Sequence, residues 1–508
     1  MATNATYLSF SLVFLALLSS GLLIIVSDAF SIEEATIKDL QLAFKQNQLT
    51  SSTLVEFYLG EIHKLNQKLR GVIEVNPDAL RLAEKADQER KSGAARSKLG
   101  LHGIPILLKD NIATKDKMNT TAGSFALLGS IVPRDAFVAT KLIKAGAIIL
   151  GKASMSEWAG IRDAPTGWCA RSGQGKNPYL LSAEPCGSSS GSAISVASNM
   201  AAVSLGTETD GSILCPSAAN SVVGIKPTIG LTSRDGVVPL SPRQDTVGTV
   251  ADAVYVLDAI VGFDHNDKAT REASKYIPRG GYKQFLKPDG LKRKRLGIVR
   301  LTFSSTANAS EVIEAFERHI QTLREQGAIV VENLEIANID EILDQNKSGE
   351  LYAILTEFKM ALDTYLKGLK ASPVRSLKDV IAFNKKFSKL ENTKEYGQSF
   401  LEAAQATNGT DYKLKAALSN LTKLSRDGLE KLMKEEKLDA VITPDVYIAI
   451  VLAIGGFPGI TVPAGYSNDG FPFGIYFGGL KGSEPSLIEI TYGFEQATKI
   501  RKPPSFKP

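Results

Sequence analysis

Residues 205–218, LGTETDGSILCPSA, contain the turn from which the fold and the chemistry of this chain can be worked out. Ser212 follows Gly211 in a glycine-bearing turn, and a helix is predicted to start near Pro216, because proline is favoured in the first turn of a helix. A turn that feeds a helix presents free backbone N–H groups, which stabilise a developing negative charge. The stretch therefore predicts a serine beside an anion-binding turn.

A second serine turn precedes it. Residues 187–191, GSSSG, fit the pattern G-x-S-x-G with Ser189 at the centre, and the helix-forming stretch SAISVASNMAA follows. A nucleophile elbow of this type needs an acid and a histidine later in the chain. Only His265 and His319 lie downstream, both in charged stretches where we expect exposure. A His-dependent α/β hydrolase using Ser189 is therefore one alternative, and a simple turn between a strand and a helix is another.

The third candidate is Lys109, which ends the apolar strand predicted for GIPILLKDN, residues 103–111. Open α/β sheets bind ligands at the carboxyl ends of their strands, where a lysine is partly desolvated. A lysine that extends its ammonium group into water is the competing interpretation.

Taken together, KDN (109–111), GSSSGS (187–192) and TETDGSILCPSAANSVVGIKPT (207–228) resemble the amidase signature family. Further stretches are similar to the family: GAIILGKASMSEWA, ARSGQGKNPY, GFPGITVPAGYSNDGFPFGI and ITYGFEQAT. The resemblance covers residues 31–503 and is weakest over 270–430. The spellings CGSSSGS and GTETDGSI resemble those of peptide amidases and their plant relatives.

This resemblance implies a serine-dependent hydrolysis of carboxamides by a Ser-cisSer-Lys triad, with no cofactor and no metal. Ser212 would be the nucleophile, Ser188 the bridging serine with a cis peptide bond, and Lys109 the base. The oxyanion would be held by the backbone N–H groups of Thr209, Asp210, Gly211 and Ser212, and Ser189 would add a supporting hydrogen bond. The substrate would be a small or peptide amide, such as a peptide carboxy-terminal amide.

Composition excludes several other kinds of chemistry. The 508 residues carry a net charge of +5 without a long basic block, so no nucleic-acid partner is expected. The four histidines are scattered, and the three cysteines form no CxxC pair, which argues against a zinc site and a disulfide framework. Cys186 and Cys215 are interpreted as buried small residues. GAIILGK, residues 146–152, is interpreted as a buried strand and not as a phosphate loop, since Ala153 stands where Ser or Thr is needed.

The amino terminus has an apolar run from Leu8 to Val26, followed by small residues. We predict a cleaved signal peptide over residues 1–29 and a secreted or endomembrane protein. The alternative is a membrane anchor through residues 8–26, which is the only way in which a membrane would be a partner. Sequons that fit a secretory route lie at Asn119, Asn308, Asn346, Asn408 and Asn420.

Alternating apolar runs and helical stretches indicate an α/β fold. The resemblance specifies a single large domain, residues 31–503, in which a twisted mixed sheet is covered by helices on both faces. Residues 100–260 would be the signature core and 270–430 a helical cover, with closing strands, a helix near 486–497 and a tail at 504–508. Ser31 and Glu34 have capping-box spacing, which predicts a helix from residue 31 with Ile37, Leu40 and Phe44 on its buried face.

Two related functions compete with hydrolysis. A tRNA-dependent amidotransferase component shares the triad but needs tRNA and a partner protein, which a secretory amino terminus does not fit. An inactive, membrane-anchored receptor on an amidase-like scaffold should lose triad residues, whereas Lys109, Ser188 and Ser212 are all present.

Overall fold

A computed structural model describes residues 30–93, 100–251, 253–301 and 309–507. The signal-peptide prediction and the sequon at Asn308 lie outside these residues. Among the helices of the described residues, none is both long and apolar enough to cross a membrane.

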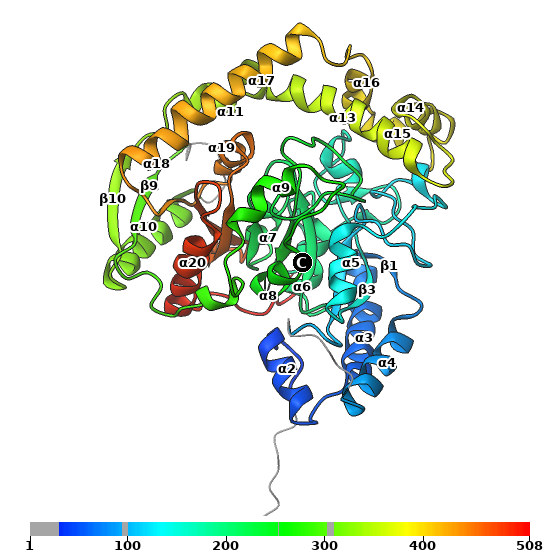
Figure 1. Cartoon of the computed structure of the whole chain (residues 1–508), viewed down its shortest axis with the longest axis horizontal. Coiled ribbons are helices and arrows are strands. Elements are labelled where there is room, and N and C mark those ends of the chain that lie inside the picture. Colours follow the sequence, from blue (N-terminus) through cyan, green and yellow to red (C-terminus); the bar gives the residue numbers. More distant parts are fainter. Residues whose placement is uncertain (1–29, 94–99, 252, 302–308, 508) are drawn as a thin grey trace, which may run out of the picture.

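The centre of the molecule is an eleven-stranded mixed sheet (Figure 1). Its strand order is β1-β3-β2-β6-β8-β7-β12-β13-β11-β9-β10. The strands are β1 (Val72–Val75), β2 (Pro105–Lys109), β3 (Ile148–Ala153), β6 (Ser204–Glu208), β7 (Gly224–Lys226), β8 (Thr246–Val250), β9 (Arg295–Val299), β10 (Ile329–Leu334), β11 (Ala440–Thr443), β12 (Gly459–Tyr466) and β13 (Pro472–Gly478). A separate small hairpin consists of β4 (Trp168–Cys169) and β5 (Gly173–Gln174).

The α-helices of the described residues are α2 (Ile37–Lys45), α3 (Ser51–Leu69), α4 (Ala79–Lys91), α5 (Phe137–Lys144), α6 (Ser190–Ala197), α7 (Leu214–Ala219), α8 (Ala253–Ile260), α9 (Ala269–Ala273), α10 (Ala309–Glu325), α11 (Ile339–Leu343), α12 (Gln345–Ser348), α13 (Glu350–Gly368), α14 (Leu377–Lys386), α15 (Thr393–Tyr396), α16 (Ser399–Gln405), α17 (Tyr412–Ser425), α18 (Lys431–Glu435), α19 (Ile448–Gly455) and α20 (Glu484–Thr498).

Helices cover both faces of the sheet, as strand β11 illustrates. Successive side chains of a strand point to opposite faces. Ile442 packs into a cluster with Phe316 of α10 and Leu487 of α20, whereas its neighbour Val441 packs into a cluster with residues of α17 and α19. The predicted α/β fold with a mixed sheet is confirmed.

The stretch 270–430 is only partly the helical cover that we expected. Its long helices α13 and α17 pack along each other and form an arch at the top of the view in Figure 1. However, β9 and β10 also belong to this stretch and extend one edge of the sheet as a parallel pair. Strand β10 is an edge strand whose side chains are half-buried or exposed. Its apolar residues Ile329, Val330 and Val331 were included in the helical cover because charged helical segments surround them.

The helix predicted from residue 31 begins later, at Ile37. Its N-cap is Thr36, whose side chain accepts a hydrogen bond from the Asp39 amide, while the Asp39 carboxylate accepts one from the Thr36 amide. A capping box therefore exists, but at Thr36 and Asp39 and not at Ser31 and Glu34. The predicted apolar face is confirmed, since Ile37, Leu40 and Phe44 are all buried.

Candidate active site

The candidate site lies where two neighbouring parallel strands end. Strands β2 and β6 pair in parallel, with Leu108 opposite Leu205, so their carboxyl ends meet at one edge. Lys109 is the last residue of β2 and is completely buried. This position is the one predicted from the apolar run that precedes it.

The Lys109 ammonium nitrogen is surrounded by oxygen acceptors. Nζ lies 2.8 Å from the Ser188 Oγ, 3.0 Å from the Ser189 Oγ and 3.0 Å from the Thr207 carbonyl oxygen. The structure thus brings the lysine into contact with Ser188 and Ser189, two of the three serines of the GSSSG turn. The Thr207 carbonyl is a further hydrogen-bond acceptor for Lys109. The sequence reasoning missed it because a backbone carbonyl is present in every residue and leaves no motif.

The pKa of Lys109 falls to about 7, because burial disfavours its charged form. The buried carboxyl groups of Glu208 and Asp245 oppose this effect and limit the decrease. A lysine with this pKa is substantially neutral near pH 7, as a general base must be. Neither acid was predicted as part of the site: Glu208 lies within the quoted TETDGS motif but was assigned no role, and Asp245 is a lone acid without a motif.

The two serine turns are held against each other by backbone contacts. The peptide bond between Gly187 and Ser188 is cis, and the Ser189 amide donates to the Ser212 carbonyl at 3.0 Å. Ser188 and Ser212 retain 3% and 7% of their surface exposed, whereas Ser189 is fully buried and donates its hydroxyl to the Thr207 carbonyl. Ser189 therefore helps to hold the Lys109 side chain in place.

The turn before α7 presents amide groups, as the anion-binding prediction requires. The Glu208 carboxylate accepts hydrogen bonds from the amides of Ile213 at 2.6 Å and Leu214 at 2.9 Å. The Gly211 amide also hydrogen-bonds this carboxylate. Within the part of the chain that the structure describes, the amides of Thr209, Asp210 and Ser212 have no acceptor. Three of the four predicted oxyanion donors are thus available, whereas the Gly211 amide is already engaged.

The helical cover reaches this turn through Asp210. Gln345 of α12 donates to the Asp210 carboxylate at 3.1 Å. Burial, together with the nearby carboxyl groups of Glu350 and Glu208, raises the pKa of Asp210 well above its usual range. Residues of the 270–430 stretch therefore adjoin the serine turn.

The prediction for two cysteines is wrong. Cys186 and Cys215 form a disulfide, with their Cα atoms 6.0 Å apart and 29 residues apart in sequence. Both residues are half-buried. The third cysteine, Cys169, is free and buried. Counting three cysteines had argued against a disulfide framework, but a single bridge needs only two cysteines that the fold brings together.

The histidine alternative finds no support in the geometry. His319 is buried, contrary to expectation, and hydrogen-bonds the Ala464 carbonyl while packing on Phe494. His265 is exposed beside the ring of Phe263. The Ser189 hydroxyl is instead in contact with Lys109 and the Thr207 backbone.

The phosphate-loop match is a buried strand, as predicted. Lys152 of β3 is fully buried and donates to the Ile112 carbonyl at 2.5 Å and to the Thr120 hydroxyl at 3.0 Å. The described residues contain no group of three or more His, Cys, Asp or Glu side chains that could hold a metal ion.

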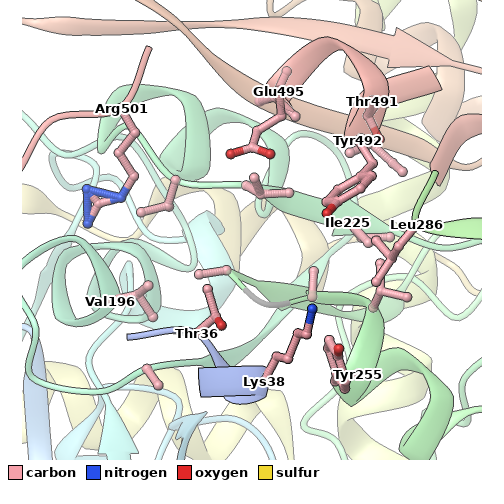
Figure 2. Close-up of a pocket in the computed structure, with 18 of the residues that line it drawn as sticks. Thr36, Lys38, Val196, Ile225, Tyr255, Leu286, Thr491, Tyr492, Glu495 and Arg501 are labelled. Carbon is pink, nitrogen blue, oxygen red and sulfur yellow. The ribbon is translucent and has the colours of Figure 1, made fainter. Parts of the chain in front are cut away.

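A cavity of about 400 Å³ lies apart from these residues. Figure 2 shows apolar side chains such as Val196, Ile225 and Leu286 around it, together with Lys38 of α2 and Glu495 of α20. None of the predicted site residues lines it. It is therefore distinct from the candidate active site.

Comparison with known proteins places this geometry in context. The Amidase family model matches residues 53–453. The chain is 59% identical to a probable amidase of Arabidopsis thaliana over 487 residues, which cover 95% of this chain and 93% of that protein. It is 38% identical to a putative amidase of Schizosaccharomyces pombe over 514 residues, which cover 94% of this chain and 87% of that protein.

Among solved structures, the peptide amidase of Stenotrophomonas maltophilia matches with a TM-score of 0.85 and 41% identity, over 94% of this chain and 99% of that chain. A structure of the peptide amidase PAM with the competitive inhibitor chymostatin matches with the same TM-score and identity, over 94% of this chain and 100% of that chain.

Proposed function

The chain belongs to the amidase signature family and hydrolyses carboxamides, and from this premise we propose that Ser212, Ser188 and Lys109 carry out the reaction. The observation that supports these roles is the 2.8 Å hydrogen bond between Lys109 and Ser188 in a buried site. The backbone contact between Ser189 and Ser212 keeps the nucleophile's turn beside this pair.

Acylation begins with neutral Lys109. The lysine takes the Ser188 hydroxyl proton while Ser188 takes the Ser212 proton, and the Ser212 oxygen attacks the amide carbonyl carbon. The negative charge that develops on the carbonyl oxygen is held by the free amides of the Thr209–Ser212 turn. These donors are fixed before the substrate binds, so they need no reorganisation during the reaction.

The proton then returns along the same path. Lys109 gives it back through Ser188 to the amide nitrogen, the C–N bond breaks, and ammonia or an amine leaves. Water attacks the ester on Ser212, loses its proton to the same relay, and releases the carboxylic acid. The sum of the steps is amide plus water to carboxylic acid plus ammonia or amine.

The substrate that we propose is a peptide carboxy-terminal amide. Support comes from the similarity to peptide amidase, including the structure with the competitive inhibitor chymostatin. The test measures ammonia release from peptide amides, benzamide and acetamide, for the wild type, Ser212→Ala and Lys109→Ala. We expect the peptide amides to have the highest kcat/KM, and both variants to lose at least about a hundredfold of it. Full activity in either variant contradicts the proposed triad.

The proposed location is the secretory pathway, with cleavage of residues 1–29. Disulfides persist mainly in oxidising compartments, and the Cys186–Cys215 bridge favours such a compartment. The sequons at Asn346 and Asn408 are exposed, whereas Asn119 and Asn420 already donate their side-chain amides to other residues. We therefore propose glycans on Asn346 and Asn408.

Expression of the full chain in a eukaryotic secretory host tests this proposal. We expect protein in the medium with an amino terminus near residue 30 and glycans at Asn346 and Asn408, as read by mass spectrometry before and after deglycosylation. A membrane-bound protein that keeps residues 8–26 would instead support the anchor.

A further inference from the structure

The disulfide lies unusually close to both proposed catalytic serines. Cys186 is two residues before Ser188, and Cys215 is three residues after Ser212. We propose that Cys186 and Cys215 are positioning residues for amide hydrolysis, and that their disulfide keeps the Ser188 and Ser212 segments in register. Full activity then requires the oxidised pair. This inference rests on the catalytic roles proposed above for the two serines.

On the nucleophile's side, the bridge is connected to the turn that carries Ser212. Cys215 is the second residue of α7, and its amide donates to the Gly211 carbonyl at 2.8 Å. Ser212 lies within the turn that this hydrogen bond closes. A displacement of Cys215 would therefore move both the nucleophile and the amides proposed to hold the oxyanion.

On the other side, only Gly187 separates Cys186 from Ser188. The Ser188 carbonyl accepts a hydrogen bond from the Ser156 amide at 3.0 Å, and its hydroxyl accepts one from Lys109. Ser188 is thus held by its hydrogen bonds to Ser156 and Lys109, and through the backbone by the nearby bridged Cys186.

Two hydrogen bonds also join the segments. The Ser189 amide donates to the Ser212 carbonyl at 3.0 Å, and the Asn220 side chain donates to the Pro185 carbonyl at 2.8 Å. These contacts remain when the disulfide is reduced, so the segments should stay together. They can open transiently, however, whereas a covalent bridge cannot. Reduction should therefore loosen the alignment of the serines without unfolding the protein.

The remaining cysteine offers a matched control. Cys169 is buried, and its sulfur is within hydrogen-bond distance of the Ser172 hydroxyl. Burial raises its pKa to about 11, so little thiolate forms near neutral pH. An effect of a thiol reagent on activity can then be assigned to the Cys186–Cys215 pair by replacing Cys169.

The experiment uses the purified enzyme with dithiothreitol, which donates two electrons and two protons. The S–S bond breaks, Cys186 and Cys215 each become a thiol, and dithiothreitol closes to its cyclic disulfide. Ammonia release from a peptide amide gives kcat and KM for the oxidised, reduced and reoxidised wild type, the Cys186→Ser/Cys215→Ser double variant and Cys169→Ser. The rate of Ser212 labelling by a fluorophosphonate and the Tm are measured on the same samples.

We expect reduction to lower kcat and the labelling rate by about tenfold or more, since small misplacements of reacting groups cost rate steeply. KM should change by less than about twofold, because the bridge supports the reacting serines rather than the substrate pocket. Reoxidation should restore kcat, the double variant should match the reduced enzyme, and Cys169→Ser should behave as the wild type does.

An unchanged kcat in wild type whose two thiols are shown free by mass spectrometry would overturn the inference. So would a double variant with a lower Tm and full kcat, since the bridge would then serve stability alone. Reduction of the folded wild type supplies the comparison if the double variant does not fold. An oxidised wild type with neither ammonia release nor Ser212 labelling would overturn the proposed function and this inference together.

Discussion

The ionisation of Lys109 makes a quantitative prediction for the pH dependence of the enzyme. With a pKa of about 7, the neutral fraction of Lys109 is about one in eleven at pH 6 and about ten in eleven at pH 8. Because kcat/KM reports ionisations of the free enzyme, it should rise about tenfold between these pH values and level off above pH 8. A lysine with an ordinary pKa near 10.4 would instead give about a hundredfold rise without levelling.

A single substitution should move this profile in a known direction. Glu208 is a buried carboxyl group that raises the pKa of Lys109. Glu208→Gln removes its charge but keeps an oxygen that can accept from the Ile213 and Leu214 amides. The pKa of Lys109 should fall further, so the midpoint of kcat/KM should move to lower pH. Lys109→Arg, which stays protonated, should lose activity at every pH.

The assay is ammonia release from an uncharged peptide amide between pH 5.5 and 9, with Tm measured for each variant. Glu484→Gln is the matched control. Like Glu208, Glu484 is buried and accepts a hydrogen bond from a backbone amide, that of Thr228. It is not among the groups that raise the pKa of Lys109. Its midpoint should equal that of the wild type. A Glu208→Gln midpoint at higher pH, or a wild-type profile that rises without levelling, would refute the role of Lys109 as the base.

Three further predictions concern packing around the site and the core. A Cβ on Gly206 would lie 2.8 Å from the Ser189 Oγ, so Gly206→Ala should displace this serine and lower kcat/KM by about tenfold. Gly60 has open space around it, so the control Gly60→Ala should leave kcat/KM unchanged. Ser189→Ala should lower kcat/KM by about five- to tenfold, because Lys109 keeps its other acceptors while losing one hydrogen bond of about 1 kcal/mol. Leu452→Ala removes a fully buried side chain and should lower the free energy of unfolding by about 2–5 kcal/mol in a urea titration.

Buried strands and the residues at their ends could be predicted because their signals are local. The run GIPILL predicts a strand, and the structure gives β2 ending at Lys109. The end of β2 lies at the same edge of the sheet as the end of β6 because the two strands are parallel. The KDN motif at the end of β2 and the TETDGS motif at the end of β6 therefore adjoin in space. The late start of α2 was missed because two capping-box spacings compete near the amino terminus. The edge strand β10 was missed because its short apolar run, residues 329–331, lies in a stretch dominated by charged helical segments.

The cysteine pair was missed for a different reason, since its pairing is non-local. Cys186 and Cys215 are 29 residues apart and become neighbours only because the chain runs through α6, returns along β6 and enters α7. The sequence did contain an indirect signal. If Ser188 and Ser212 act in one site, residues within two or three positions of each must also be close. Placing two catalytic serines together therefore constrains their flanking residues, and a cysteine beside each serine should be examined as a possible pair before it is counted as a separate core residue.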